Sequence, residues 1–207
     1  MKKILIALGA AALLILPAGA KAQTNGTDFR RNEISLSYGI LPTTSWMDMI
    51  TDMFILVGTG ATGSPQTRNS SELGAFTASY YYRFNKVLAV GGSYTYSRID
   101  KQIINADTNV KIGKAASNYH TVMPTLKVNW LNRGVISLYS KVSAGISIGT
   151  YRETYDRGNG SDFRDTAVMF AFQVSPIGIE AGHGLAGFLE AGIGNTGTVM
   201  AGIRYRF

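Results

Sequence analysis

The last ten residues, Thr198-Val-Met-Ala-Gly-Ile-Arg-Tyr-Arg-Phe207, alternate between two kinds of side chain. Successive side chains of an extended strand point to opposite faces, so this segment has one apolar face and one mostly polar face. The apolar face carries Val199, Ala201, Ile203, Tyr205 and Phe207. Because it ends on an aromatic ring with no polar residue after it, we predict a strand that turns this face toward something other than water.

The N-terminal segment predicts export. Lys2 and Lys3 precede an apolar run over residues 4–16, and small residues follow over 18–22. This is the layout of a secretory signal peptide, residues 1–22, and we expect its cleavage after Ala22 to leave residues 23–207 as one domain. A retained membrane anchor is the alternative. The apolar run over residues 4–16 is too short for a membrane-spanning anchor, since a helix needs about 20 apolar residues to cross a bilayer.

Composition excludes several classes of protein. The chain has no cysteine, so neither a disulfide framework nor a lipidated cysteine is available. The formal charge of +7 falls to near +4 when Lys2, Lys3 and Lys21 leave with the signal peptide. The remaining basic residues are scattered, which disfavours nucleic acid as a partner. Charged residues make up 16% of the chain, against about 25% in soluble domains, which is unusual for a protein that faces water on all sides.

Alternation with a period of two recurs along the chain and predicts seven further strands. They cover residues 32–40, 73–84, 87–97, 117–130, 135–149, 166–180 and 187–194. Long loops are expected at 41–72, 98–116 and 150–165, and short turns at 85–86, 131–134, 182–185 and 195–197. Proline removes a ladder donor, so we expect a bulge or broken pairing at Pro124. Pro176 and Gly178 are expected to disturb the register ahead of Glu180.

Residues 45–57 depart from this alternation and show helical spacing. Ser45 with Asp48 three residues later is typical of a helix N-terminus. The apolar face of the predicted helix carries Trp46, Ile50, Met53, Phe54 and Val57. We predict a short amphipathic helix in the first long loop. It either packs over the barrel mouth or outer rim, or lies in the lipopolysaccharide interface or docks a partner.

The eight strands admit two kinds of barrel. A soluble barrel such as a lipocalin would turn the apolar faces inward and expose polar faces rich in Lys and Glu. Here the polar faces carry mostly Gly, Ser, Thr and Ala with isolated charges, which suit the narrow interior of an eight-stranded barrel. The apolar faces carry aromatic residues near strand ends, as lipid-facing strands do. We therefore predict an all-β fold: an eight-stranded antiparallel up-and-down transmembrane β-barrel.

Several segments, in this order, resemble the small eight-stranded outer-membrane β-barrel proteins, the family of the transmembrane domain of outer membrane protein A and of outer membrane protein X. They are Tyr-Tyr-Tyr-Arg-Phe-Asn (80–85), Met-Pro-Thr-Leu-Lys-Val-Asn-Trp (123–130), Ser-Leu-Tyr-Ser-Lys (137–141), Gln-Val-Ser-Pro-Ile-Gly (173–178) and Tyr-Arg-Phe (205–207). The resemblance covers the mature chain. It implies an outer-membrane protein with both termini in the periplasm and long loops outside, and an assembly signal at Tyr205 and Phe207 that the barrel-assembly machinery reads.

The residues that catalysis would require are sparse. Two barrels of similar kind are enzymes acting on lipid A, a deacylase with a His-X-Ser pattern and a palmitoyltransferase that pairs a loop histidine with Asp-Ser. The first pattern is absent at His120 and His183, and Asp-Ser occurs nowhere in the chain. Two distant histidines without cysteine do not form a transition-metal site. The aspartates at 156, 162 and 165 form either a solvated charge cluster or a weak calcium site.

Charged side chains on the polar faces are the candidate functional residues. They are Arg83, Lys127, Lys141, Glu190, Arg204 and Arg206. Unpaired charges in a narrow lumen are costly, so we expect Glu190 to pair with Arg204 or with a lumenal lysine. Such a network either fills and closes the barrel or forms a gated pore.

Together these features predict a non-enzymatic outer-membrane protein, structural or surface-binding through its external loops. A narrow solute or ion channel is the alternative, and a lipid A-modifying enzyme comes third. The expected partners are outer-membrane lipids including lipopolysaccharide, the assembly machinery, and an unidentified external ligand. We expect a monomer with no cofactor, no metal and no nucleic acid partner.

Overall fold

The computed structural model describes residues 29–42, 66–104, 111–155 and 162–207. The predicted signal peptide and the predicted helix at 45–57, with Trp46, Ile50, Met53 and Phe54, lie outside the described residues. Within the described part of the chain, no helix is long and apolar enough to cross a membrane.

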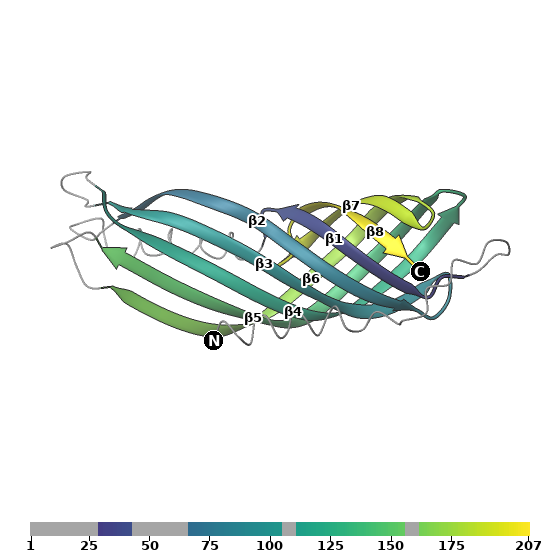
Figure 1. The fold of residues 1–207 in the computed structure, drawn as a ribbon, viewed down its shortest axis with the longest axis horizontal. Helices are drawn as coiled ribbons and strands as arrows, with labels where there is room; N and C mark the ends of the chain where they lie inside the picture. Colours follow the sequence, from purple (N-terminus) through teal and green to yellow (C-terminus); the bar gives the residue numbers. More distant parts are fainter. Residues whose placement is uncertain (1–28, 43–65, 105–110, 156–161) are drawn as a thin grey trace.

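The described residues form eight β-strands, each antiparallel to its neighbours in the chain. They are β1 (Asn32–Ile40), β2 (Gln66–Arg83), β3 (Leu88–Ile104), β4 (Lys111–Arg133), β5 (Ile136–Tyr155), β6 (Phe163–Gly182), β7 (Leu185–Gly194) and β8 (Val199–Arg206). β8 pairs with β1, so the sheet closes into an up-and-down barrel (Figure 1). The predicted fold class, an eight-stranded antiparallel barrel, is confirmed.

The seam between β1 and β8 runs from the Glu33–Arg206 pair to the Ile40–Val199 pair. At its end, the backbone of Asn32 exchanges two hydrogen bonds with Phe207, of 3.1 and 2.9 Å. We call this end, where β1 starts and the short turns after β2, β4 and β6 lie, the turn end. The opposite end is the loop end. Closure leaves no free edge along the seam, which a strand immersed in lipid requires.

The apolar faces point outward. On β1, the side chain of Leu36 is 61% exposed, whereas the neighbouring Ser35 is 7% exposed. Aromatic side chains lie exposed on the outer wall near the turn end: Tyr80, Phe84, Trp130 and Tyr205. The interior holds small polar residues, charged residues and several larger side chains such as Tyr81, Tyr139 and Met123. The predicted orientation of the two faces is therefore confirmed, and the barrel carries an apolar outer wall.

Five strands continue past the eight-stranded part at the loop end. Figure 1 shows β2 to β6 running on at the left of the view beyond the ends of β1, β7 and β8. Parts of all three predicted long loops, 41–72, 98–116 and 150–165, are therefore strand, and the expectation is wrong there: β2 begins at Gln66, β3 continues to Ile104, β4 begins at Lys111, β5 continues to Tyr155 and β6 begins at Phe163. The outer face of the extension carries charged residues such as Arg98, Lys114 and Arg152, and its inner face includes the buried Ile99, Ile103 and Ala115, so the alternation of the apolar wall does not continue here.

The two strand prolines behave differently. Pro124 pairs in register with Gly92 of β3, while the β4–β5 ladder passes from Val122 to Thr125 without a shift. The pairing is therefore locally broken there but not bulged. Between Val174 and Ile177 the β6–β7 register does shift, which confirms the disturbance predicted at Pro176.

The β7–β8 turn folds into the mouth of the eight-stranded part. Thr196 is buried, and its backbone N–H donates to the side-chain carbonyl of Gln173 over 3.0 Å. The amide of Gln173 donates in turn to the carbonyl of Gly197 over 3.1 Å. Gly194 and Gly197 have φ angles of +147° and +124°, a region that L side chains rarely adopt. These contacts end the β6–β7 ladder and leave the half of β6 toward the loop end without a β7 partner.

Candidate functional site

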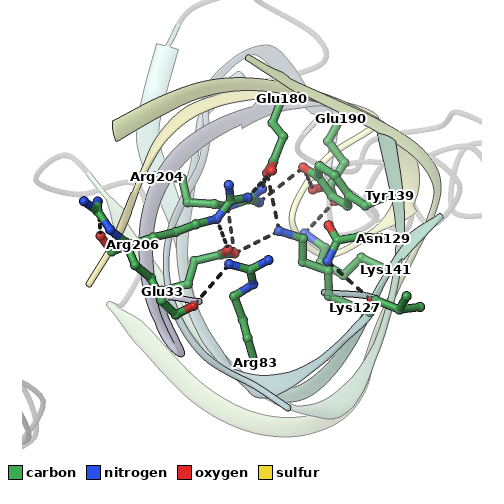
Figure 2. A network of polar contacts seen from close by, with 12 residues as sticks. Glu33, Arg83, Lys127, Asn129, Tyr139, Lys141, Glu180, Glu190, Arg204 and Arg206 are labelled. Atoms are coloured by element: carbon green, nitrogen blue, oxygen red, sulfur yellow. Dashed lines mark hydrogen bonds and ion pairs between the residues drawn. The ribbon is translucent and has the colours of Figure 1, made fainter. Parts of the chain in front are cut away.

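A cluster of charged side chains fills the barrel interior near the turn end (Figure 2). Its members face inward from seven strands and are each at most 9% exposed. They are Glu33, Arg83, Lys127, Lys141, Glu180, Glu190, Arg204 and Arg206. Five cations and three carboxylates therefore share a narrow interior, and ions buried in this way require partners.

Two carboxylates hold the centre of this charge cluster. Glu33 Oε1 lies 2.9 Å from both Lys127 Nζ and Arg204 Nε, and Glu33 Oε2 lies 2.9 Å from Arg206 Nε. Glu180 pairs with both arginines as well, and its Oε2 lies 3.5 Å from Lys127 Nζ. These side chains come from β1, β4, β6 and β8. They meet across the lumen, as Figure 2 shows, so the cluster ties opposite walls together.

Glu190 forms a second pair beside this centre. Its Oε1 lies 2.5 Å from Lys141 Nζ, and its Oε2 accepts a 2.9 Å hydrogen bond from the hydroxyl of Tyr139. Arg204 Nη2 donates to the same hydroxyl over 3.3 Å. The Tyr139 ring also lies 4.5 Å below the ammonium of Lys127. Glu190 thus contacts a lumenal lysine directly and Arg204 through Tyr139, which makes the two pairs one connected network.

Arg83 stands apart from the ion pairs. Its Nη1 donates to the backbone carbonyl of Arg30 over 3.1 Å, and its guanidinium lies 4.8 Å from the ring centroid of Phe29. Among the described residues, its Nε has no hydrogen-bond partner. Arg83 faces inward at the turn-end mouth, so it adds positive charge at this opening.

Hydroxyl pairs line the interior between this cluster and the loop end. The side-chain oxygens of Thr77 and Thr95 lie 2.9 Å apart, and Thr121 donates to Ser147 over 2.8 Å. Such small groups satisfy one another from neighbouring strands and carry no charge. The interior therefore changes from charged at the turn end to neutral and polar in its middle.

Glu180 and Glu33 are the two carboxylates of the network that are absent from the set predicted from the sequence. The bulge after Val174 leaves Pro176 and Ile177 both facing out, so the alternation that places Gln173 inside assigns Glu180 to the wrong face. Pro176 and Gly178 within the strand are the sequence signals of this change. Glu33 lies on the polar face of the first predicted strand, but its several partners depend on contacts across the lumen.

Family profiles yield no match to this chain, and no curated protein matches it either. Among solved structures, a crystal structure of Ail, the attachment invasion locus protein of Yersinia pestis, is 16% identical with a TM-score of 0.48, over 87% of this chain and 100% of that one. A second structure of Ail, in complex with the heparin analogue sucrose octasulfate, is 18% identical with a TM-score of 0.46, over 86% and 99%. Likeness at this level assigns no ligand or activity to this chain.

The two histidines lie far apart in the barrel. His120 is on the outer wall toward the loop end, where its Nδ1 lies 2.7 Å from the hydroxyl of Tyr94. His183 lies in the turn between β6 and β7 at the opposite end. In the part of the chain that the structure describes, no three acidic or histidine side chains gather closely enough to hold a metal ion.

Proposed function

We propose that this chain is an integral outer-membrane protein without catalytic activity, whose barrel anchors an external binding surface. The observation that carries the proposal is the combination of an apolar outer wall with a five-stranded extension at one end. An apolar wall around a closed barrel fits a lipid environment, since closure leaves the spanning strands paired on both sides. The extension of β2 to β6 then stands outside the membrane.

Export and orientation follow the same reasoning. The signal peptide is removed after Ala22, and the turn end, where Phe207 lies, faces the periplasm. Short turns are typical of the periplasmic side of such barrels and longer connections of the external side. The loop end of β2 to β6 therefore faces outward from the cell, where it meets external molecules.

A binding role fits the extension better than a channel fits the lumen. Side chains of Glu33, Lys127 and Arg204 meet from opposite walls at the turn end. The turn that carries Thr196 folds into the mouth of the eight-stranded part. Above this level β6 has no β7 partner, and within the described residues this side of the strand is an edge, the kind of site at which an external strand can pair.

A charged substitution on the outer wall tests the membrane placement. Leu126, in the middle of β4, is 44% exposed. Leu126→Arg is expected to lower the free energy of unfolding in lipid vesicles by about 2–4 kcal/mol, because an arginine near the bilayer midplane is poorly solvated. Thr154→Arg, on the exposed part of β5, is the matched control with little expected effect. Equal stability of the two variants would indicate a water-facing barrel.

Shortening the extension tests the binding role. Asp100 and Ala116 are register partners on β3 and β4, so residues 101–115 can be replaced by an Asn-Gly turn between them. The shortened barrel is expected to fold and insert. Cells that display it should lose attachment to immobilised matrix proteins that cells with the full-length protein bind. Unchanged attachment, or no attachment by the full-length protein, would reject a binding role for the extension.

A further inference from the structure

Two arginines face each other on the outer wall just beyond its apolar part. Arg152 of β5 and Arg164 of β6 are direct register partners, and both are exposed. Each lies four residues along its strand from the last apolar pair, Ile148 and Val168, which are 40% and 67% exposed. Alternation along the strands places all four side chains on the same outer face.

Like charges directly opposite each other in a sheet are unfavourable unless an anion lies between them. Four described acids lie near this pair, and each of them contacts other groups. Asp162 Oδ1 accepts a 3.3 Å hydrogen bond from the backbone N–H of Tyr155, and Asp165 Oδ1 accepts one of 2.8 Å from the backbone N–H of Thr166. Asp100 forms a bidentate ion pair with Arg98, with 2.7 Å between Oδ1 and Nη2. Glu153 accepts hydrogen bonds from the hydroxyls of Tyr151 and Tyr155. None of these four carboxylates forms an ion pair with Arg152 or Arg164 in the described part of the chain.

Further donors surround the two arginines on the same face. Thr150 and Thr166 form the register pair between them and the apolar part, and each carries a hydroxyl. Lys114 of β4 pairs with Thr154, one row further from the membrane, and it is exposed. Guanidinium forks, hydroxyls and an ammonium are the groups that bind phosphate.

The position of Arg152 and Arg164 along the membrane normal indicates which molecule supplies the phosphate. Four residues along a strand tilted by about 40° raise the arginine backbone roughly 10 Å above the last apolar pair. Arginine side chains reach several ångströms further, so their guanidinium groups lie at the level of the lipid headgroups. In the outer leaflet of such a membrane the headgroup is a phosphorylated glucosamine.

We propose that Arg152 and Arg164 form a binding site for a phosphate of lipopolysaccharide on the outer wall of β5 and β6. The inference rests on the proposed placement of the barrel in the outer membrane. Thr150 and Thr166 donate from below, and Lys114 adds charge from above. The bound phosphate neutralises the arginine pair and fixes the height at which the extension leaves the membrane.

Binding of purified lipid A to the folded full-length protein in detergent tests the site. Intact-protein mass spectrometry compares lipid A carrying both phosphates with lipid A from which they have been removed. The unaltered protein should prefer the phosphorylated form at least about tenfold, because charge-assisted hydrogen bonds to phosphate are strong. R152Q/R164Q should lose that preference, and R152K/R164K should keep only part of it, since lysine lacks the planar fork.

The matched control is K86Q/R133Q, which removes two exposed charges at the turn end and should bind as the unaltered protein does. Folding of each variant is checked by its heat-dependent shift on gels, and single variants at Arg152 or Arg164 replace the double variant if it does not fold. Wild-type affinity in R152Q/R164Q, or equal affinity for the two lipid A forms, would overturn the site. If heparin fragments of the same total charge displace lipid A, the two arginines bind a polysaccharide. That result would overturn the lipid assignment.

The experiments distinguish an error in the proposed membrane location from an error in the proposed phosphate site. A protein that stays folded and monodisperse without detergent, and that tolerates Leu126→Arg, contradicts the proposed function itself. A membrane barrel that binds both lipid A forms equally contradicts only the phosphate site.

Discussion

Glu33 and Arg206 lie opposite each other across the seam that closes the barrel, with 2.9 Å between Glu33 Oε2 and Arg206 Nε, although 173 residues separate them in the chain. The pair belongs to the first and last strands, and Glu33 also contacts Lys127 of β4. Closure of the sheet is thus coupled to a charge cluster that reaches the opposite wall.

Glu33→Gln is expected to destabilise the barrel strongly. The substitution keeps the shape of the side chain but leaves Lys127, Arg204 and Arg206 with Glu180 as their shared acid. Removing one partner from a buried ion network costs about 3–5 kcal/mol, because the remaining charges stay buried without compensation. Urea unfolding in lipid vesicles, followed by tryptophan fluorescence, measures the loss.

The matched control for this prediction is Glu153→Gln. Glu153 lies on the extension, where its carboxylate accepts hydrogen bonds from the hydroxyls of Tyr151 and Tyr155. Its substitution should cost less than about 1.5 kcal/mol, the net value of an ordinary hydrogen bond. A similar loss in both variants would show that the lumenal network contributes no more than a surface contact.

Lys141 and Glu190 are expected to be strongly coupled. Their charged atoms lie 2.5 Å apart in the interior, so either Lys141→Met or Glu190→Gln alone leaves a buried charge. The double variant removes both charges and should be more stable than at least one single variant, with a coupling energy of about 1–3 kcal/mol. A double-mutant cycle by equilibrium unfolding gives this value, and additive effects would contradict the pairing.

The parts of the strands that form the apolar wall could be predicted from the sequence. The continuations of β2 to β6 into the extension could not. In the wall, one face is apolar and the other is small or polar, so period two is visible from Leu36 to Ile203. In the extension, neighbours such as Arg152 and Glu153 are both charged although they face opposite sides. Without an apolar outer face the pattern is lost, so these segments resemble charged loops.

The sequence predicts that charged side chains face the barrel interior, but it does not predict which of them form ion pairs. Alternation alone places Lys127, Arg204 and Arg206 inside the barrel. It does not reveal Glu180, because the bulge beside Pro176 reverses which residues face inward. It also does not show which charges meet across the lumen, since that depends on barrel closure and on the register of β1 against β8.

The folded protein is expected to be electrically silent in planar bilayers. Side chains of Glu33, Lys127, Glu180 and Arg204 meet across the lumen, and ions would have to break these contacts to pass. Single-channel recording at neutral pH checks this, with a porin in the same bilayers as the positive control. Stable openings that change with Glu190→Gln would instead support the channel alternative.

The ring of Phe207 and its backbone are expected to act at different stages. The backbone closes the seam through two hydrogen bonds with Asn32, and the ring stacks 5.8 Å from that of Tyr205 on the outer wall. Phe207→Ala keeps both hydrogen bonds, so refolding into lipid vesicles should be nearly unchanged. If the assembly machinery reads the ring, the amount of barrel in the outer membrane of cells should fall severalfold.

Deleting Phe207 also removes the two backbone hydrogen bonds and should weaken both refolding and cellular assembly. An equal loss of refolding and of cellular assembly in Phe207→Ala would show that the ring supports the seam rather than recognition.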